Sequence, residues 1–298
     1  MPCYSPLPAC REEGGGPLRF GVRKENADLM LPCGQCIGCR LDRSVSWAVR
    51  VMAEAQGHFM SSFITLTYDD AHLPYGGSLH YRHFQLFMKR LRFKIGPRRF
   101  FMCGEYGGEL GRPHYHAALF GVEFGDRYPW RKSPAGFQLY RSALLDSLWD
   151  LGNAEIGDLS FDSAAYIARY CTKKITGNMA EHHYAKLVPD TGEIIQLEPE
   201  FARMSLKPGI GAEWFDKYKS DCIPRDAVIL EGRSVPIPRY FLDRLSEDER
   251  SEYALRQFAK HGNVWPEIDG ESSPERLRVR EAVARAGLLS NTTNRSLE

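Results

Sequence analysis

The chain has 298 residues, and its 39 lysines and arginines against 38 aspartates and glutamates give a net charge of +1. Hydrophobic residues make up 43% and charged residues 26%, which excludes a disordered or fibrous chain. No run of about 18 consecutive apolar residues occurs, which excludes a membrane-spanning helix. The opening segment has no basic stretch followed by an apolar run, so we expect no secretory signal. Eight cysteines in such a chain indicate metal ligands or free thiols more than disulfides.

The predicted elements begin with a segment rich in proline and glycine, residues 1–32, which we expect to be an irregular arm. Trp47, Val51 and Ala55 then recur at helical spacing, which predicts a helix from about residue 41 to 57 with one buried face. The remaining elements up to residue 175 are expected as strands over 62–68, 99–106, 114–122 and 154–159 and as helices over 81–95, 142–149 and 162–175, the last capped by Asp162-Ser163.

The order of these elements between residues 61 and 160 is β-α-β-β-α-β. This order is typical of the α+β class and of the ferredoxin-like split β-α-β fold, in which helices pack on one face of an antiparallel sheet. We therefore expect the other face of the sheet to stay free for a ligand.

The last third of the chain gives weaker signals. We expect a hairpin with strands at 185–188 and 193–197, a glycine loop at 207–211 before a short aromatic helix, and two charged, peripheral helices after Tyr240. The chain thus divides into an N-terminal arm with a cysteine knuckle and a helix (1–58), a central core (59–178) and a C-terminal extension (179–298).

A basic block stands out against the near-zero net charge. Between Arg82 and Arg99 the chain has seven lysines and arginines and no acidic residue, interleaved with Phe84, Phe87 and Phe93. Such a block is either a solvated helix face or the footprint of a polyanion, and the aromatic residues favour an amphipathic helix with a basic outer face. The candidate DNA-binding residues are Lys89, Arg90, Arg92, Lys94, Arg98 and Arg99.

Two histidines lie inside a predicted strand at positions 114 and 116. Alternate residues of a strand point to the same face, so the two imidazoles converge and could begin a divalent metal site. Glu105, on the neighbouring strand across a short hairpin, is the best candidate for the carboxylate ligand, with Glu109 in the turn as its competitor. The alternative is a pair of hydrogen-bonded surface histidines.

The last predicted helix of the core carries Tyr166 and Tyr170, four residues apart and therefore on one face. Lys173 and Lys174 follow one turn later on the same side. These residues form either an aromatic core pair with two solvated lysines or a nucleophilic site. A phenol has a pKa of about 10, so as a nucleophile it needs help from a cation or a metal.

Cys33, Cys36 and Cys39 form a C-x2-C-x2-C knuckle, which suits a structural zinc ion. Zinc takes four ligands, and the fourth would come most simply from Cys3 or Cys10. An iron–sulfur cluster lacks its local fourth cysteine, because position 43 is an arginine. Three cysteines without a metal are the remaining alternative.

Four motifs in this order resemble the HUH endonucleases, and in particular the replication initiators of microviruses of the gokushovirus type: FITLTYDD, GEYG, RPHYHAALF and YIARYCTKK. The segments PCGQCIGCR and KPGIGAEWFDKY are also similar to that group, so the resemblance covers most of the chain.

The resemblance implies a role for each matching position. Glu105, His114 and His116 match the ligands of Mg²⁺ or Mn²⁺, with Tyr115 in a slot usually filled by a bulky hydrophobic residue. Tyr166 and Tyr170 match the two nucleophiles, on a catalytic helix after the fourth strand of an HUH-type sheet, and Lys173 or Lys174 matches the assisting lysine.

The resemblance also implies an enzyme of rolling-circle DNA replication. Such an initiator nicks single-stranded or melted origin DNA through a tyrosine, forms a 5′-phosphotyrosine bond with a free 3′-OH, and rejoins the ends to release circular single-stranded DNA. It would act in the bacterial host cytoplasm, with the host helicase and polymerase as partners. Three alternatives remain: an HUH transposase or relaxase, a metal-dependent nuclease that forms no covalent adduct, and a nucleic-acid-binding module without activity.

Overall fold

The computed structural model describes residues 3–12, 16–108, 111–169, 174–175, 177–189, 191–261 and 273–293. The chain forms two compact units, residues 1–43 with 246–295, and residues 44–245 with 296–298. The three-part division predicted from the sequence stays a prediction. Within the described ranges, no helix has both the length and the apolar character needed to cross a membrane.

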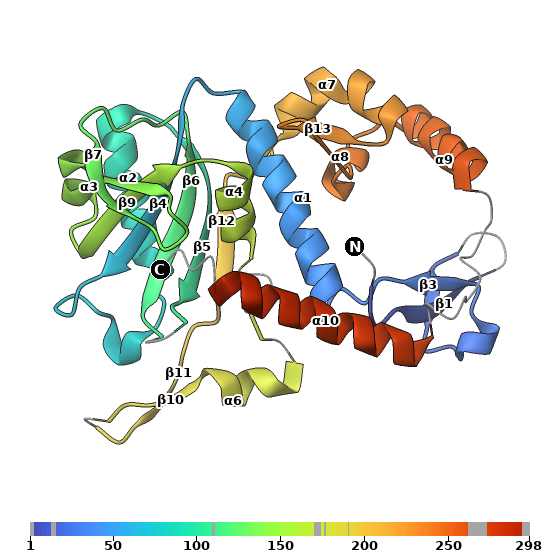
Figure 1. Ribbon diagram of the computed structural model, residues 1–298, viewed down its shortest axis with the longest axis horizontal. Coiled ribbons are helices and arrows are strands. Elements are labelled where there is room, and N and C mark those ends of the chain that lie inside the picture. Colours follow the sequence, from blue (N-terminus) through green and yellow to red (C-terminus); the bar gives the residue numbers. More distant parts are fainter. Residues whose placement is uncertain are drawn as a thin grey trace. The chain divides into compact units, whose positions relative to one another are not determined.

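The larger unit is built on a sheet of seven antiparallel strands in the order β12-β5-β6-β4-β9-β8-β7 (Figure 1). With helices α2 and α3 it keeps the predicted β-α-β-β-α-β order, in an α+β protein. A hairpin, β7–β8, and the edge strand β12 extend the sheet beyond the four predicted strands. The elements are β4 (Ser61–Tyr68), α2 (Tyr81–Ile95), β5 (Arg99–Tyr106), β6 (Pro113–Phe120), β7 (Tyr128–Lys132), β8 (Gln138–Arg141), α3 (Ala143–Leu148), β9 (Gly152–Asp158) and β12 (Phe201–Met204).

One face of the sheet is covered by α2 and α3. Ile64 and Leu66 of β4 pack there against Phe84 and Phe87 of α2 and Leu145 of α3, all with no exposed area. The hydrophobic effect of this burial holds the two helices on the sheet.

The other face is also covered, so the prediction that it stays free is wrong. Helices α1 (Ile37–Gln56) and α4 (Phe161–Ala168) lie on that side of the sheet (Figure 1). The two helices pack on the strand side chains that point away from α2 and α3. The second core cluster formed in this way includes Ala48, Val51, Phe63, Phe101, Ala118, Phe120, Ala164 and Ile167. Every residue of β6 is buried, because this central strand carries apolar or paired side chains on both faces.

Helix α4 starts and ends differently from the prediction. Ser160, not Asp162-Ser163, is its N-cap, and Ser163 completes a capping box with it. The helix ends at Ala168 instead of residue 175. The amide of Ile175 donates to the hydroxyl of Tyr184 at 3.0 Å, so a tertiary contact takes the place of a helical hydrogen bond there.

The prediction of an irregular arm over residues 1–32 is also wrong, because this segment contains a three-stranded antiparallel sheet in the order β2-β1-β3. These strands are short and lie largely at the surface, so no alternation of apolar residues marks them in the sequence. Their bounds are β1 (Leu7–Arg11), β2 (Leu18–Phe20) and β3 (Leu29–Leu31), with a 3-10 turn η1 (Lys24–Asn26).

The predicted hairpin, aromatic helix and two charged helices of the C-terminal third are confirmed as β10–β11, α7, α9 and α10. This part of the chain contains η3 (Gly177–Met179), α6 (Ala180–Tyr184), β10 (Ala185–Leu187), β11 (Ile194–Gln196), α7 (Ala212–Arg225), β13 (Val228–Leu230), β14 (Arg233–Val235), α8 (Arg239–Leu242), α9 (Glu247–His261) and α10 (Pro274–Thr293), and η2 (Tyr75–Gly77) lies earlier, before α2.

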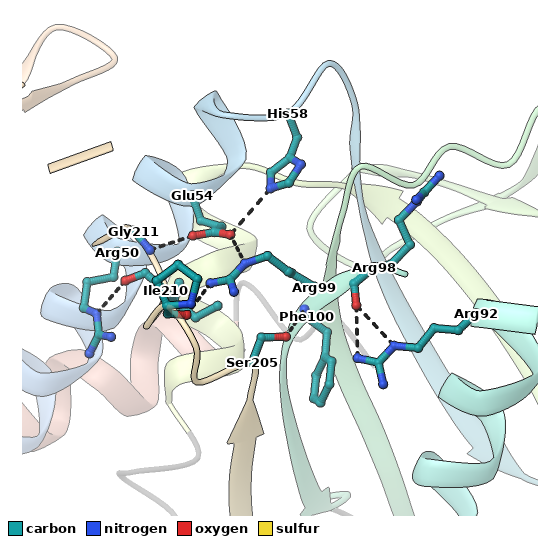
Figure 2. Close-up of polar contacts among 11 residues, drawn as sticks. Arg50, Glu54, His58, Arg92, Arg98, Arg99, Phe100, Ser205, Ile210 and Gly211 are labelled. Carbon is teal, nitrogen blue, oxygen red and sulfur yellow. Dashed lines mark hydrogen bonds and ion pairs between the residues drawn. The ribbon is translucent and has the colours of Figure 1, made fainter. Parts of the chain in front are cut away.

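A buried carboxylate joins α1, β5 and the glycine loop (Figure 2). Glu54 is 9% exposed and accepts hydrogen bonds from the Arg99 guanidinium at 2.5 Å and from the Gly211 amide at 2.7 Å. Gly211 has a φ of 77°, and a Cβ there would lie 2.9 Å from the Arg50 carbonyl oxygen, so the loop requires glycine at this point.

We expect Glu54→Ala to lower the free energy of unfolding by about 2–3 kcal/mol, because the Nε–H of Arg99 and the Gly211 amide lose their acceptor. Urea unfolding at neutral pH measures this change. Glu213→Ala, an exposed glutamate on α7, is the matched control and should change stability by less than about 0.5 kcal/mol. Equal stability of the two variants would contradict a structural role for Glu54.

Candidate functional site

The pairing of β5 with β6 brings together the three side chains that the sequence singled out as metal ligands. Glu105 lies directly opposite His114, and His116 lies two residues further along β6, on the same face. The Glu105 Oε1 atom is 3.2 Å from His114 Nε2 and 3.4 Å from His116 Nε2. The three side chains are almost fully buried, with exposed fractions of 1%, 7% and 4% for the residues. Glu109, the competing candidate, lies outside the described residues.

Each imidazole is oriented by a contact at its Nδ1 atom. His114 Nδ1 lies 3.0 Å from the carbonyl oxygen of Arg112, which can only accept, so Nδ1 carries the hydrogen. His116 Nδ1 lies 2.9 Å from the Thr65 hydroxyl. Both Nε2 atoms therefore face the Glu105 carboxylate, as metal-ligating histidines do when their second nitrogen is hydrogen-bonded.

This donor set fits a divalent cation. With its Nδ1 hydrogen directed at the Arg112 carbonyl oxygen, a neutral His114 presents the Nε2 lone pair to a carboxylate oxygen, and two acceptors this close need a proton or a cation between them. Two ligand atoms in adjacent octahedral positions, each about 2.1 Å from the ion, lie about 3.0 Å apart. The observed 3.2 and 3.4 Å are close to that value.

Helix α4 brings a phenol to the same carboxylate. The Tyr166 hydroxyl donates to Glu105 Oε1 at 3.2 Å, and its ring meets the His116 ring edge-on with 4.9 Å between centroids. Ser44 of α1 fixes this helix by donating to the Ala165 carbonyl oxygen at 3.0 Å. The structure therefore places Tyr166 at the triad formed by Glu105, His114 and His116.

The other predicted catalytic residues are only partly covered by the structure. Tyr170 and Lys173 lie outside the described residues. Lys174 is described and half-buried, directly before Ile175.

Tyr115, the aromatic residue between the two histidines, points to the opposite face of β6. Its hydroxyl lies 2.8 Å from the Tyr68 hydroxyl and also donates to the His80 carbonyl oxygen at 2.9 Å. Burial raises the pKa of Tyr115, so this phenol stays protonated. It is therefore a core residue and no competitor of Tyr166.

The predicted DNA-binding residues do not lie with the triad. Most of them belong to α2, which packs on the other face of the sheet, and Arg99 lies six residues before Glu105 on β5, about 20 Å away. Arg90 pairs with Asp150 at 2.7 Å, and Arg99 pairs with Glu54. Arg98 is half-buried. Lys89, Arg92 and Lys94 are exposed on the outer face of α2.

Sequence reasoning missed the residues that orient the site, namely Thr65, Arg112 and Ser44. Thr65 carries a usable signal, because it alternates with the apolar residues of β4 and so belongs to the face of the histidines. Arg112 acts through its backbone carbonyl, and Ser44 acts across 121 residues, so neither has a local signal.

In the smaller unit, Cys3 joins Cys33, Cys36 and Cys39, whose sulfur atoms all lie within 4.8 Å of one another. The structure thus selects Cys3 over Cys10, which lies on β1 outside this group. Backbone amides point at the sulfurs, with Cys33 N 3.3 Å from Cys3 Sγ and Cys36 N 3.2 Å from Cys33 Sγ. Within the described ranges, no disulfide involves Cys3, Cys10, Cys33, Cys36, Cys39 or Cys222.

The amides around the cysteine group favour a thiolate. Burial acts to raise the pKa of Cys36, but hydrogen bonds from the Cys39 and Tyr4 amides and from neighbouring thiols lower it to about 7. Burial raises the pKa of Cys3. A group of four thiols with one already acidic is suited to a metal ion.

Comparison with known proteins shows which family this chain belongs to. The family described as "Replication-associated protein ORF2/G2P" matches residues 61–175, the segment that contains Glu105, His114, His116 and Tyr166. The Replication-associated protein VP4 of Bdellovibrio phage phiMH2K is 32% identical over 284 residues, which cover 92% of this chain and 82% of that protein. No solved structure matches the chain.

Two further relatives carry the same kind of description. The Replication-associated protein ORF2 of Spiroplasma virus 4 is 33% identical over 239 residues, which cover 76% of this chain and 70% of that protein. The Replication-associated protein ORF4 of Chlamydia phage 1 is 30% identical over 235 residues, which cover 75% of this chain and 56% of that protein. The chain therefore belongs to the family of phage replication-associated proteins, and its resemblance to the replication initiators of microviruses is confirmed.

Proposed function

We propose that this protein takes part in phage genome replication as a metal-dependent endonuclease and ligase that cuts and rejoins single-stranded origin DNA through a tyrosine. The observation that carries the proposal is the 3.2 Å contact between the Tyr166 hydroxyl and a buried carboxylate shared by two imidazoles. The HUH-type fold proposed for the core rests on its β-α-β-β-α-β order and on the resemblance of its motifs.

In the proposed reaction the Tyr166 oxygen attacks the scissile phosphorus and its proton is released to solvent. A bond forms between the tyrosine oxygen and the 5′-phosphate of the downstream DNA, and the bond from phosphorus to the 3′ oxygen breaks. The 3′ oxygen takes up a proton from solvent and leaves as a hydroxyl, which a host polymerase can extend. The ester keeps the energy of the phosphodiester, so rejoining needs no ATP.

The residues of the site have separate tasks in this proposal. Glu105, His114 and His116 would hold Mg²⁺ or Mn²⁺, which supplies charge stabilisation at the phosphate when bound. Glu105 also orients the Tyr166 hydroxyl. Tyr170 is proposed as the second nucleophile, which cuts the regenerated origin so that the free 3′-OH can displace the first linkage.

The proposed DNA contacts lie outside the triad. The exposed Lys89, Arg92 and Lys94 would bind the phosphate backbone, and Arg98 and Arg90 would flank them. Arg99 donates hydrogen bonds to Glu54 and to the Pro208 carbonyl oxygen, so its main role is structural. The protein would act on DNA in the host cytoplasm together with the host helicase and polymerase.

We expect the purified protein, given single-stranded circular DNA and Mn²⁺, to form a covalent protein–DNA band on denaturing gels, and EDTA to abolish it. Tyr166→Phe and Tyr170→Phe should each reduce the band, and the double variant should lose it. Cleavage without a covalent band would favour the metal-dependent nuclease, and binding without cleavage would favour the recognition module.

The orienting hydroxyl of Thr65 gives a second prediction. Thr65→Val should weaken Mn²⁺ binding about 10- to 100-fold, because it removes the hydrogen bond that fixes His116. Titration calorimetry with Mn²⁺ alone measures the affinity. Thr67→Val is the matched control on the same strand and face, and it should leave the affinity unchanged. Equal loss in both variants would contradict an orienting role.

We further propose that Cys3, Cys33, Cys36 and Cys39 bind a single structural zinc ion. Tetrahedral Zn–S bonds of about 2.3 Å place two sulfur atoms about 3.8 Å apart. The Cys3 and Cys36 sulfurs are 3.8 Å apart in the structure. An iron–sulfur cluster places several metal and sulfide ions between its ligands and holds the thiolates further from one another, so the close group favours one ion.

The protein purified without chelators should therefore contain one zinc ion per chain by atomic emission. Cys33→Ser should lose the ion, whereas Cys10→Ser, on the neighbouring strand β1, should keep it. Iron in place of zinc, or equal zinc content in the two variants, would contradict the assignment.

A further inference from the structure

A buried tyrosine–glutamate pair lies just beyond the proposed catalytic residues. Tyr184, the last residue of α6, is 2% exposed, and Glu200 is 5% exposed. The Tyr184 hydroxyl donates to Glu200 Oε2 at 2.5 Å and accepts from the Ile175 amide at 3.0 Å. One hydroxyl thus links the backbone directly after Lys174 to a carboxylate 25 residues away.

Glu200 is itself fixed to the strand that carries the metal ligand. It directly precedes β12, whose first residue, Phe201, pairs with Gly104, the neighbour of Glu105. The next residue of β5, Tyr106, donates to the Glu198 carbonyl oxygen at 2.7 Å, which holds the segment before Glu200. The pair therefore connects the backbone at Ile175 with the strand that carries Glu105.

The Tyr184 hydroxyl stays protonated at physiological pH. Burial and the hydrogen bond to Glu200 raise the pKa of Tyr184 to about 12, so the hydroxyl keeps its proton and keeps donating. A buried hydroxyl with both a donor and an acceptor satisfied also fixes its ring position.

We propose that Tyr184 and Glu200 are positioning residues for strand transfer. They hold the backbone at Ile175, and with it Lys174, at a fixed position relative to the strand that carries Glu105. This inference rests on the proposed function. Neither residue touches the triad, and neither belongs to a motif of the sequence, so their contribution comes through the position of the residues that act on DNA.

A structural role alone would make a different prediction from a positioning role. Tyr184→Phe leaves the Glu200 carboxylate buried without its donor, which lowers the melting temperature. The double variant Tyr184→Phe/Glu200→Leu removes both polar partners and restores stability, but the Ile175 amide remains without its anchor. If the pair only stabilises the fold, the nicking rate should recover in the double variant.

We expect both variants to form the covalent adduct about 10- to 100-fold more slowly than the wild type at saturating single-stranded circular DNA with Mn²⁺, because small misplacements of reacting groups are costly. The half-saturating DNA concentration should stay unchanged. Tyr75→Phe is the matched control, since Tyr75 also donates to a glutamate, Glu193 at 2.8 Å, in an exposed contact. It should nick at the wild-type rate.

Three results would overturn the inference. Wild-type rates in Tyr184→Phe, or recovery of the rate together with the melting temperature in the double variant, would leave the proposed nicking function intact and remove only the positioning role. A wild-type protein that forms no adduct would remove both proposals.

Discussion

The pairing of β5 with β6 is the constraint on which the proposed centre depends. Its register sets Glu105 opposite His114, and the alternation of a strand brings His116 to the same face. A slip of one residue in this pairing would put Glu105 and the two histidines on opposite faces of the sheet and leave buried polar groups without partners. The registers on both sides of β6 hold it in place, because β4 pairs with it along seven residue pairs.

The helices on the second face of the sheet complete the proposed site, because α4 carries Tyr166. Helix α4 brings Tyr166 onto the triad, whose three side chains are almost fully buried, and Ser44 of α1 fixes α4. Electrostatic interactions are stronger in such a buried place than at the surface. The cost is that each polar group needs a partner, which Thr65 and the Arg112 carbonyl supply.

Local patterns in the sequence were sufficient for the central elements and for the triad. The strand over 99–106 and the helix over 81–95 have the predicted bounds, because a buried face gives each a clear period. Contacts between distant residues carry no such period. The sequence therefore did not reveal that the Ile175 amide would donate to Tyr184, or that α1 would cover the second face of the sheet.

Mapping the covalent linkage tests the central claim most directly. After reaction with single-stranded circular DNA and Mn²⁺, nuclease trimming and trypsin digestion separate Tyr166 from Tyr170, because trypsin cleaves after Arg169 between them. Mass spectrometry should find nucleotides attached through a 5′-phosphate to the peptide of Tyr166, to that of Tyr170, or to both. Attachment at any other residue, or cleaved DNA with no linked peptide, would contradict the assignment of the triad and α4 as a tyrosine strand-transfer centre.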